Sequence, residues 1–265
     1  MDHYADERDY ALLENDRYTF FVLRRIIDQT CELLLSDHDK LILCYSGSPY
    51  PVWIWTPDHS SIEEMDGAYS LAQENGLLDG KHHFIVKYQL AEHFIETASG
   101  EGKRMSIQKN MFAYDCLHPI KPSVTADGMI HRCNSDDMED MTELISLFHE
   151  ETGVDRKSAA EYRKEAENDV KDGNVFLWKN EHGYSVAICK FNPRGDMASV
   201  NRVFTRPDFR RMHYAENLVY QVTMKVKEAG YIPMLYTDAD YAASNACYEK
   251  IGYVLRGKLC SIGFL

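Results

Sequence analysis

Two blocks near the C-terminal end hold the residues whose types and spacing best suit chemistry. The first block, residues 203–219, reads VFTRPDFRRMHYAENLV, which predicts a short strand, a basic loop and an amphipathic helix. The first amides of a helix have no partner inside the helix, and the helix dipole adds positive charge there, so this position suits a diphosphate. The second block, residues 235–253, reads LYTDADYAASNACYEKIGY and predicts strand, helix and strand.

Both blocks resemble the coenzyme A half of a GNAT-type N-acetyltransferase. The resemblance implies that Val203, Phe204 and Thr205 form the strand that pairs with the pantetheine arm. It implies acetyl-CoA as co-substrate and acetyl transfer to an amine by direct attack in a ternary complex. It also assigns the coenzyme pyrophosphate to a loop made of Arg210, Arg211, Met212, His213, Tyr214 and Ala215.

The loop departs from the family pattern R/Q-x-x-G-x-G/A at one position. Arg210 and Ala215 match the pattern, while His213 stands where the first glycine is expected. Glycine lets the backbone approach a phosphate and adopt positive φ, which a histidine side chain penalises. A residue inside the first helical turn needs no positive φ, and its imidazole can donate to a phosphate, so we expect coenzyme binding to be retained. Taken alone, Arg210 and Arg211 would be a solvated charge pair, but the preceding strand and following helix favour a phosphate loop.

The second block carries the expected proton donor. By resemblance, Tyr248 lies beside the sulfur of coenzyme A, where a phenol can protonate the departing thiolate. The structural alternative is a core aromatic residue three positions before Ile251. Asn245 resembles an asparagine of the family that contacts the pantetheine arm. A purely structural role for Asn245, as a helix cap or turn residue, is equally compatible with the sequence. Cys247 points about 100° away from Tyr248 on a helix and has no partner base nearby in sequence, so we do not expect a covalent cysteine mechanism.

Signals for the acceptor side are weaker. The resemblance implies that a backbone N–H near Val203 donates to the thioester carbonyl as negative charge develops. Asn201 stands in the same strand where an acidic residue could have served as a base. We name no general base, because the remaining candidates are more simply explained as solvated loop carboxylates: Asp238, Asp240, Glu150 and Glu151.

The elements that position these residues predict an α/β fold with a mixed sheet and two domains. Residues 129–265 follow the order β-α-α-β-β-β-α-β-α-β, which is the order of the GNAT acyltransferase fold. Residues 1–122 predict a smaller α/β domain of unknown role, and a degenerate GNAT-like half would suit its pattern although the sequence shows no repeat. The breaker-rich string HPIKPSVTADG is the expected boundary. We expect the first domain to form one wall of the acceptor site or a homodimer surface.

The amino-acid composition limits the classes of binding partner. The 265 residues carry a formal net charge of -13, which disfavours nucleic acid and anionic membranes and suits a cationic small-molecule or peptide amine. Seven scattered cysteines predict no disulfide framework. We expect no metal, because His82, His83 and His93 lack a completing ligand set. No run approaches the roughly 18 apolar residues of a membrane span, and the start is acidic, so we expect a cytoplasmic protein.

Two other functions stay open at this point. The first is a coenzyme A-binding regulator or pseudoenzyme, in which His213 and the absent base mark a lost activity. The second is a Fem-type aminoacyl transferase, which also uses paired GNAT-like domains. The negative charge argues against the second, because tRNA binding depends on dense Lys and Arg patches.

Overall fold

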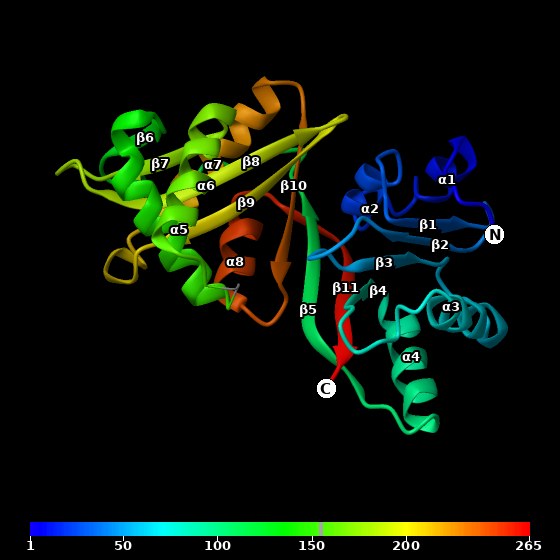
Figure 1. Cartoon of the computed structure of the whole chain (residues 1–265). Helices are drawn as coiled ribbons and strands as arrows, with labels where there is room; N and C mark the ends of the chain where they lie inside the picture. The colour runs from blue at the N-terminus through cyan, green and yellow to red at the C-terminus, as the bar shows by residue number, and fades with distance from the viewer. Residues whose placement is uncertain (154–155) are drawn as a thin grey trace. The chain divides into compact units, whose positions relative to one another are not determined.

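The computed structural model describes residues 1–153 and 156–265, which separate into two compact units (Figure 1). The first unit comprises Met1–Tyr114, Tyr236–Tyr241 and Leu255–Leu265, and the second comprises Asp115–Leu235 and Ala242–Val254. This division differs from the expected domains 1–122 and 129–265. The expected boundary loop lies inside the second unit, and the C-terminal strand lies in the first, where it pairs antiparallel with β4 (Phe84–Val86). A sequence pattern predicts that a strand exists, but it does not name its pairing partner.

The first unit arranges its strands in the order β1-β2-β3-β4-β11-β5. Side chains alternate across these strands: Leu43 and Ile54 pack with α3 and α4, whereas Trp53 and Trp55 pack with α1 and α2. The two short N-terminal helices therefore form one layer of this unit. Its elements are α1 (Glu7–Leu12), α2 (Phe21–Ile26), β1 (Leu33–Ser36), β2 (Ile42–Tyr45), β3 (Val52–Trp55), α3 (Ile62–Glu74), β4, α4 (Tyr88–Gly100), β5 (Met105–Asp115) and β11 (Val254–Phe264).

The second unit arranges its strands in the order β10-β9-β8-β7-β6. Val175 and Leu177 pack with α5 and α6, while the intervening Phe176 lies under Lys225 of α7, so helices cover both faces (Figure 1). Among the described helices, none is both long enough and apolar enough to cross a membrane. The elements are β6 (Met129–Arg132), α5 (Met138–Thr152), α6 (Ala159–Asp172), β7 (Val175–Lys179), β8 (Ser185–Arg194), β9 (Met197–Thr205), α7 (Tyr214–Glu228), β10 (Ile232–Asp238) and α8 (Ala242–Lys250).

The two halves of the chain repeat one order of elements. The second half runs β6-α5-α6-β7-β8-β9-α7-β10-α8-β11, and the first runs α1-α2-β1-β2-β3-α3-β4-α4-β5 after an isolated bridge between Asp2 and Ser36. A short sequence trace of the repeat remains, because Thr56-Pro57-Asp58 follows β3 as Arg206-Pro207-Asp208 follows β9. The predicted mixed α/β fold is confirmed, and the first half has the element order of a GNAT-like domain.

Candidate functional site

A β-bulge interrupts β9 at the strand that the sequence assigned to the pantetheine arm. Ile188 pairs with Phe204 and Lys190 pairs with Asn201, so Arg202 and Val203 together lie opposite the single residue Cys189. Arg202 has a φ of 48°, in the left-handed region where the first residue of such a bulge is usually glycine. A bulge changes the direction of the backbone N–H and C=O groups beside it.

Beyond Ser199 the edge of β9 has no partner in β10. The parallel ladder joins Met197 to Ile232, Ala198 to Pro233 and Ser199 to Met234, and no later pair occurs among the described residues. β9 nevertheless continues to Thr205. An unpaired strand edge presents backbone donors and acceptors to an extended ligand.

Two of the assigned pantetheine-strand residues contribute differently to this edge. The side chain of Phe204 is buried in the core with α5 and α6, which leaves its backbone as the group a ligand could reach. The hydroxyl Oγ1 of Thr205 is buried and makes no hydrogen bond within the described chain. An orphaned buried hydroxyl is uncommon and is the kind of group that a bound ligand satisfies.

The loop after β9 ends at a helix that no side chain caps. A short 3-10 turn, Pro207–Phe209, precedes Arg210, and α7 begins at Tyr214. Arg211 and His213 both adopt positive φ, 62° and 63°. His213 is the N-cap residue and does not lie in the first helical turn, so the expectation that its position needs no positive φ is wrong. Glycine would adopt this conformation without the steric penalty of a Cβ.

The side chains of the loop point in different directions. The Nη2 of Arg210 pairs with Glu151, and its Nε donates to the backbone oxygen of Thr205 at 3.2 Å. Tyr214 is buried, and its hydroxyl donates to Oδ1 of Asp127 at 2.7 Å. Arg211 is exposed and forms no ion pair within the described chain. Arg211 is therefore the loop cation that is free to meet a phosphate, together with the backbone amides at the start of α7.

The corresponding helix of the first half is closed. Ser61 Oγ accepts from the Glu64 amide at 3.2 Å, and Glu64 Oε2 accepts from the Ser61 amide at 2.8 Å, which completes a capping box on α3. Glu63 adds a second negative charge to that turn. These groups satisfy two of the amides at the start of α3 and bring negative charge there, so this N-terminus suits a diphosphate less well than that of α7.

Tyr248 lies on α8 with its ring buried. It is 8% exposed, and its ring packs against that of Tyr253 with centroids 5.8 Å apart. Burial raises the pKa of Tyr248 well above the ordinary value of a phenol, so the hydroxyl stays protonated at neutral pH. Asn245 is also buried, one turn earlier on the same helix. Burial raises the pKa of the Cys247 thiol to about 12, which agrees with its rejection as a nucleophile.

Comparisons with known proteins bear on the fold. Residues 179–261 match the family model described as FR47-like protein, a span that contains both motif blocks. Across 98% of both chains, an acetyltransferase of the GNAT family from Colwellia psychrerythraea is similar with a TM-score of 0.60 at 9% identity. The chain has the fold of the GNAT superfamily. A GCN5-related N-acetyltransferase from Kribbella flavida is similar with a TM-score of 0.62 at 15% identity, over 95% of each chain.

A third solved structure is similar over nearly the whole chain. The Drosophila protein is similar with a TM-score of 0.62 at 12% identity, over 98% of this chain and 90% of that one. The search of curated proteins found no match. The resemblance to the GNAT superfamily that the two motif blocks predicted is confirmed, while the site residues assigned by that resemblance stay predictions.

The carboxylates considered as candidate bases all have other partners. Glu150 pairs with Arg156 at 2.9 Å, and Glu151 pairs with Arg210. In the first unit, Asp240 accepts a hydrogen bond from Asn110 at 2.9 Å, and Asp238 lies 3.8 Å from Lys109. Asn201 Nδ2 donates to Ser199 at 3.3 Å. Each of these side chains therefore already has a partner, and the geometry singles out none of them as a general base.

Sequence analysis missed the role of Arg202. Its Nη2 lies 2.5 Å from Glu165 Oε1, and its Nη1 contacts Asp169, whose side chain is only 3% exposed. Asp169 also pairs with Lys190 at 2.5 Å. These contacts tie the bulge of β9 to helix α6. The available signal was an arginine inside the otherwise uncharged strand sequence MASVNRVFT, ahead of which lies a helix rich in glutamate and aspartate.

Two of the three histidines expected to lack a metal-ligand set have carboxylate partners. His82 pairs with Asp79 and His93 with Asp66, each at 2.8 Å. Within the described residues, Asp6, Asp9 and His38 lie close enough to hold an ion. Their oxygens are already used, however: Asp9 accepts from His38 at 2.7 Å and from the Ser36 hydroxyl, and Asp6 pairs with Arg8. Hydrogen bonding accounts for this group without a metal.

Replacing His213 with glycine is expected to stabilise the protein by about 1 kcal/mol, because glycine removes the left-handed backbone penalty. Arg211→Gly, at a matched φ, should have a similar effect. Urea unfolding of both variants and the wild type would measure this. Destabilisation by His213→Gly would mean that the imidazole contact with Glu216, at 3.3 Å, outweighs the backbone term.

Arg202→Met is expected to destabilise the protein by about 3 kcal/mol or more, because it leaves a buried carboxylate without one of its two cations. Arg202→Gly should cost about 1 kcal/mol less, since glycine relieves the backbone strain at the bulge. Arg163→Met, which removes an exposed i,i+4 ion pair with Glu167, should cost under about 1 kcal/mol. Equal unfolding midpoints for the Arg202 and Arg163 variants would contradict a structural role for the contacts of Arg202 with Glu165 and Asp169.

Proposed function

We propose that this protein is an N-acetyltransferase that moves an acetyl group from acetyl-CoA to an amine. One observation carries the proposal: the unpartnered edge of β9 starts beside a bulge and leads into an uncapped helix with an exposed arginine. A long ligand with an amide-containing arm and a diphosphate matches both ends of this path. The arm pairs with β9 near Val203 to Thr205, and the diphosphate meets the α7 amides and Arg211.

The bulge supplies the expected electrostatic stabilisation. A backbone N–H turned out of the ladder near Val203 is suited to donate to the thioester oxygen as negative charge develops on it. The amine nitrogen forms a bond to the carbonyl carbon, the carbon–sulfur bond breaks, and the electron pair leaves with sulfur. The attacking nitrogen gives up its proton to solvent or to a solvent-linked group.

Tyr248 supports the departure of sulfur as a hydrogen-bond donor. The raised pKa of this phenol lies above that of an ordinary thiol, near 8.5, so complete proton transfer to the thiolate would be uphill. A hydrogen bond to the developing thiolate still lowers the barrier, because the phenol remains protonated throughout the neutral range. The net charge of -13 favours cationic acceptors, either small amines or peptides.

Coenzyme binding is tested by thermal shift with acetyl-CoA and with desulfo-CoA, on the wild type and on His213→Gly. Ligand at about 100 times its Kd should add roughly 2.7 kcal/mol of stability. We expect a rise in melting temperature with both ligands and both proteins. A rise only in the glycine variant would favour a regulator whose site His213 has closed, and no rise in either would remove the acyl-CoA proposal.

Tyr248→Phe is expected to lower kcat by roughly 10²-fold or more while leaving the acetyl-CoA thermal shift intact, because only the donor to sulfur is lost. Release of free thiol in a screen of amines and peptides would measure the rate. Tyr253→Phe is the matched control, since the Tyr253 hydroxyl hydrogen-bonds with that of Thr223 at 2.7 Å and the Tyr253 ring contacts that of Tyr248. Equal losses in both variants would assign the effect to packing and not to catalysis.

A further inference from the structure

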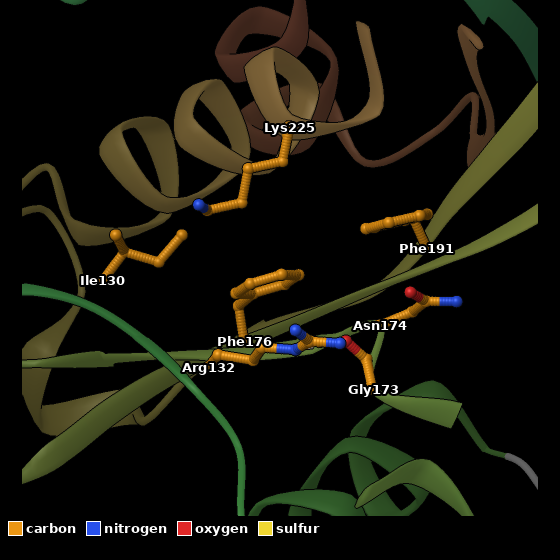
Figure 2. A pocket seen from close by; sticks show the side chains of 7 residues that line it. All are labelled: Ile130, Arg132, Gly173, Asn174, Phe176, Phe191 and Lys225. Atoms are coloured by element: carbon orange, nitrogen blue, oxygen red, sulfur yellow. Dashed lines mark hydrogen bonds between the residues drawn. The ribbon is translucent and has the colours of Figure 1, made fainter. Parts of the chain in front are cut away.

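A pocket in the second unit lies between the end of α7 and the face of β6, β7 and β8. Its cavity volume is about 290 Å³, near the lower end for small-molecule sites (Figure 2). Lys225 reaches into it from the last turn of α7, roughly 17 Å along the helix from the coenzyme loop. The pocket is therefore separate from the proposed acetyl-CoA site, and what it binds does not depend on that function.

The pocket carries positive charge in a protein that is strongly negative. Arg132 and Lys225 line it, and no aspartate or glutamate does. Neither cation forms an ion pair with any residue that the structure describes. In a chain of net charge -13, most cationic side chains form ion pairs, and Lys190 and Arg206 are examples. Two unpaired cations at one cavity attract an anion against the field of the whole protein.

Arg132 is held in position by the end of helix α6. Its Nε donates to the backbone oxygen of Gly173 at 2.8 Å, which leaves the two terminal nitrogens of the guanidinium available. Gly173 has a φ of 70°, and a Cβ there would lie 2.4 Å from Nη2 of Arg132. The positive φ favours glycine at this position, and the absence of a Cβ leaves room for the guanidinium beside the end of α6.

Two parallel aromatic rings form the apolar part of the pocket. Phe176 of β7 and Phe191 of β8 have centroids 6.2 Å apart and an interplanar angle of 10°. The ammonium of Lys225 lies 5.5 Å from the centre of the Phe176 ring, and Figure 2 shows that side chain extending from α7 toward the ring. Flat aromatic groups stack well on such rings, and an anionic group on the same ligand would meet the lysine.

We propose that this pocket binds a small aromatic carboxylate, with its ring on Phe176 and Phe191 and its carboxylate at Lys225 and Arg132. The side-chain amide of Asn174 and the apolar side chain of Ile130 complete the walls. The pocket is a second ligand site of this chain, distinct from the edge of β9.

The proposal is tested by isothermal titration calorimetry of the full chain with benzoate as the probe. Acetate carries the charge without the ring, and benzyl alcohol carries the ring without the charge. We expect benzoate to bind at least tenfold more tightly than either. Lys225→Met should weaken benzoate roughly ten- to a hundredfold, because a charged hydrogen bond is lost. Lys171→Met, at an exposed lysine on α6, is the matched control and should change the affinity less than twofold.

The alternative outcomes each overturn a part of this assignment. If acetate bound as tightly as benzoate, the pocket would not select for an aromatic ring. If Lys225→Met and Lys171→Met weakened benzoate binding equally, the effect would come from the overall charge of the protein and not from a contact in the pocket. Saturating acetyl-CoA should leave benzoate affinity unchanged, and competition would mean that the pocket belongs to the coenzyme. No saturation with benzoate, in a protein whose circular dichroism is that of a folded chain, would refute the site.

Discussion

The contact of Arg202 with Glu165 and Asp169 holds together the part of the second unit on which the proposed chemistry depends. A non-glycine residue in the left-handed region is disfavoured by one or two kcal/mol, so something must stabilise the bulge at Arg202. Two carboxylates on α6, one of them almost fully buried, provide that stabilisation. The bulge in turn redirects the backbone near Val203 beyond the last β9–β10 pair at Ser199 and Met234. Helix α6 thus acts on the site through a side chain that never reaches the ligand.

Comparison of the two halves explains why one helix N-terminus suits a diphosphate and the other does not. Both halves place a helix after the third of three consecutive strands. In the first half, the capping box of Ser61 and Glu64 satisfies two of the amides at the start of α3, and Glu63 and Glu64 bring negative charge there. In the second half, α7 begins at His213 without a side-chain cap, after a longer loop that carries Arg211. The same architecture therefore gives a structural helix in one half and an anion-receptive helix in the other.

Helix α7 connects two surfaces of different character. Its first turn lies at the basic loop, while its last turn presents Lys225 over the ring of Phe176, which lies parallel to that of Phe191. The buried side chains between them, including Val219 and Val222, fix the helix on the strands. A rigid helix of this length keeps both ends in place independently of any ligand, which supports separate sites at the two ends.

Sequence alone determined the local features of this protein. The spacing of apolar residues predicted the order of helices and strands, and the strings around Arg210 and Tyr248 predicted the GNAT fold, because these patterns arise from short-range periodicity and turn chemistry. Tertiary structure decided what depends on residues far apart in the chain. It placed β11 beside β4, put His213 at an N-cap with positive φ, and joined Arg202 to Asp169 across more than thirty positions. Strand partners, bulges and buried ion pairs arise from packing between distant segments, and no local pattern in one sequence encodes them.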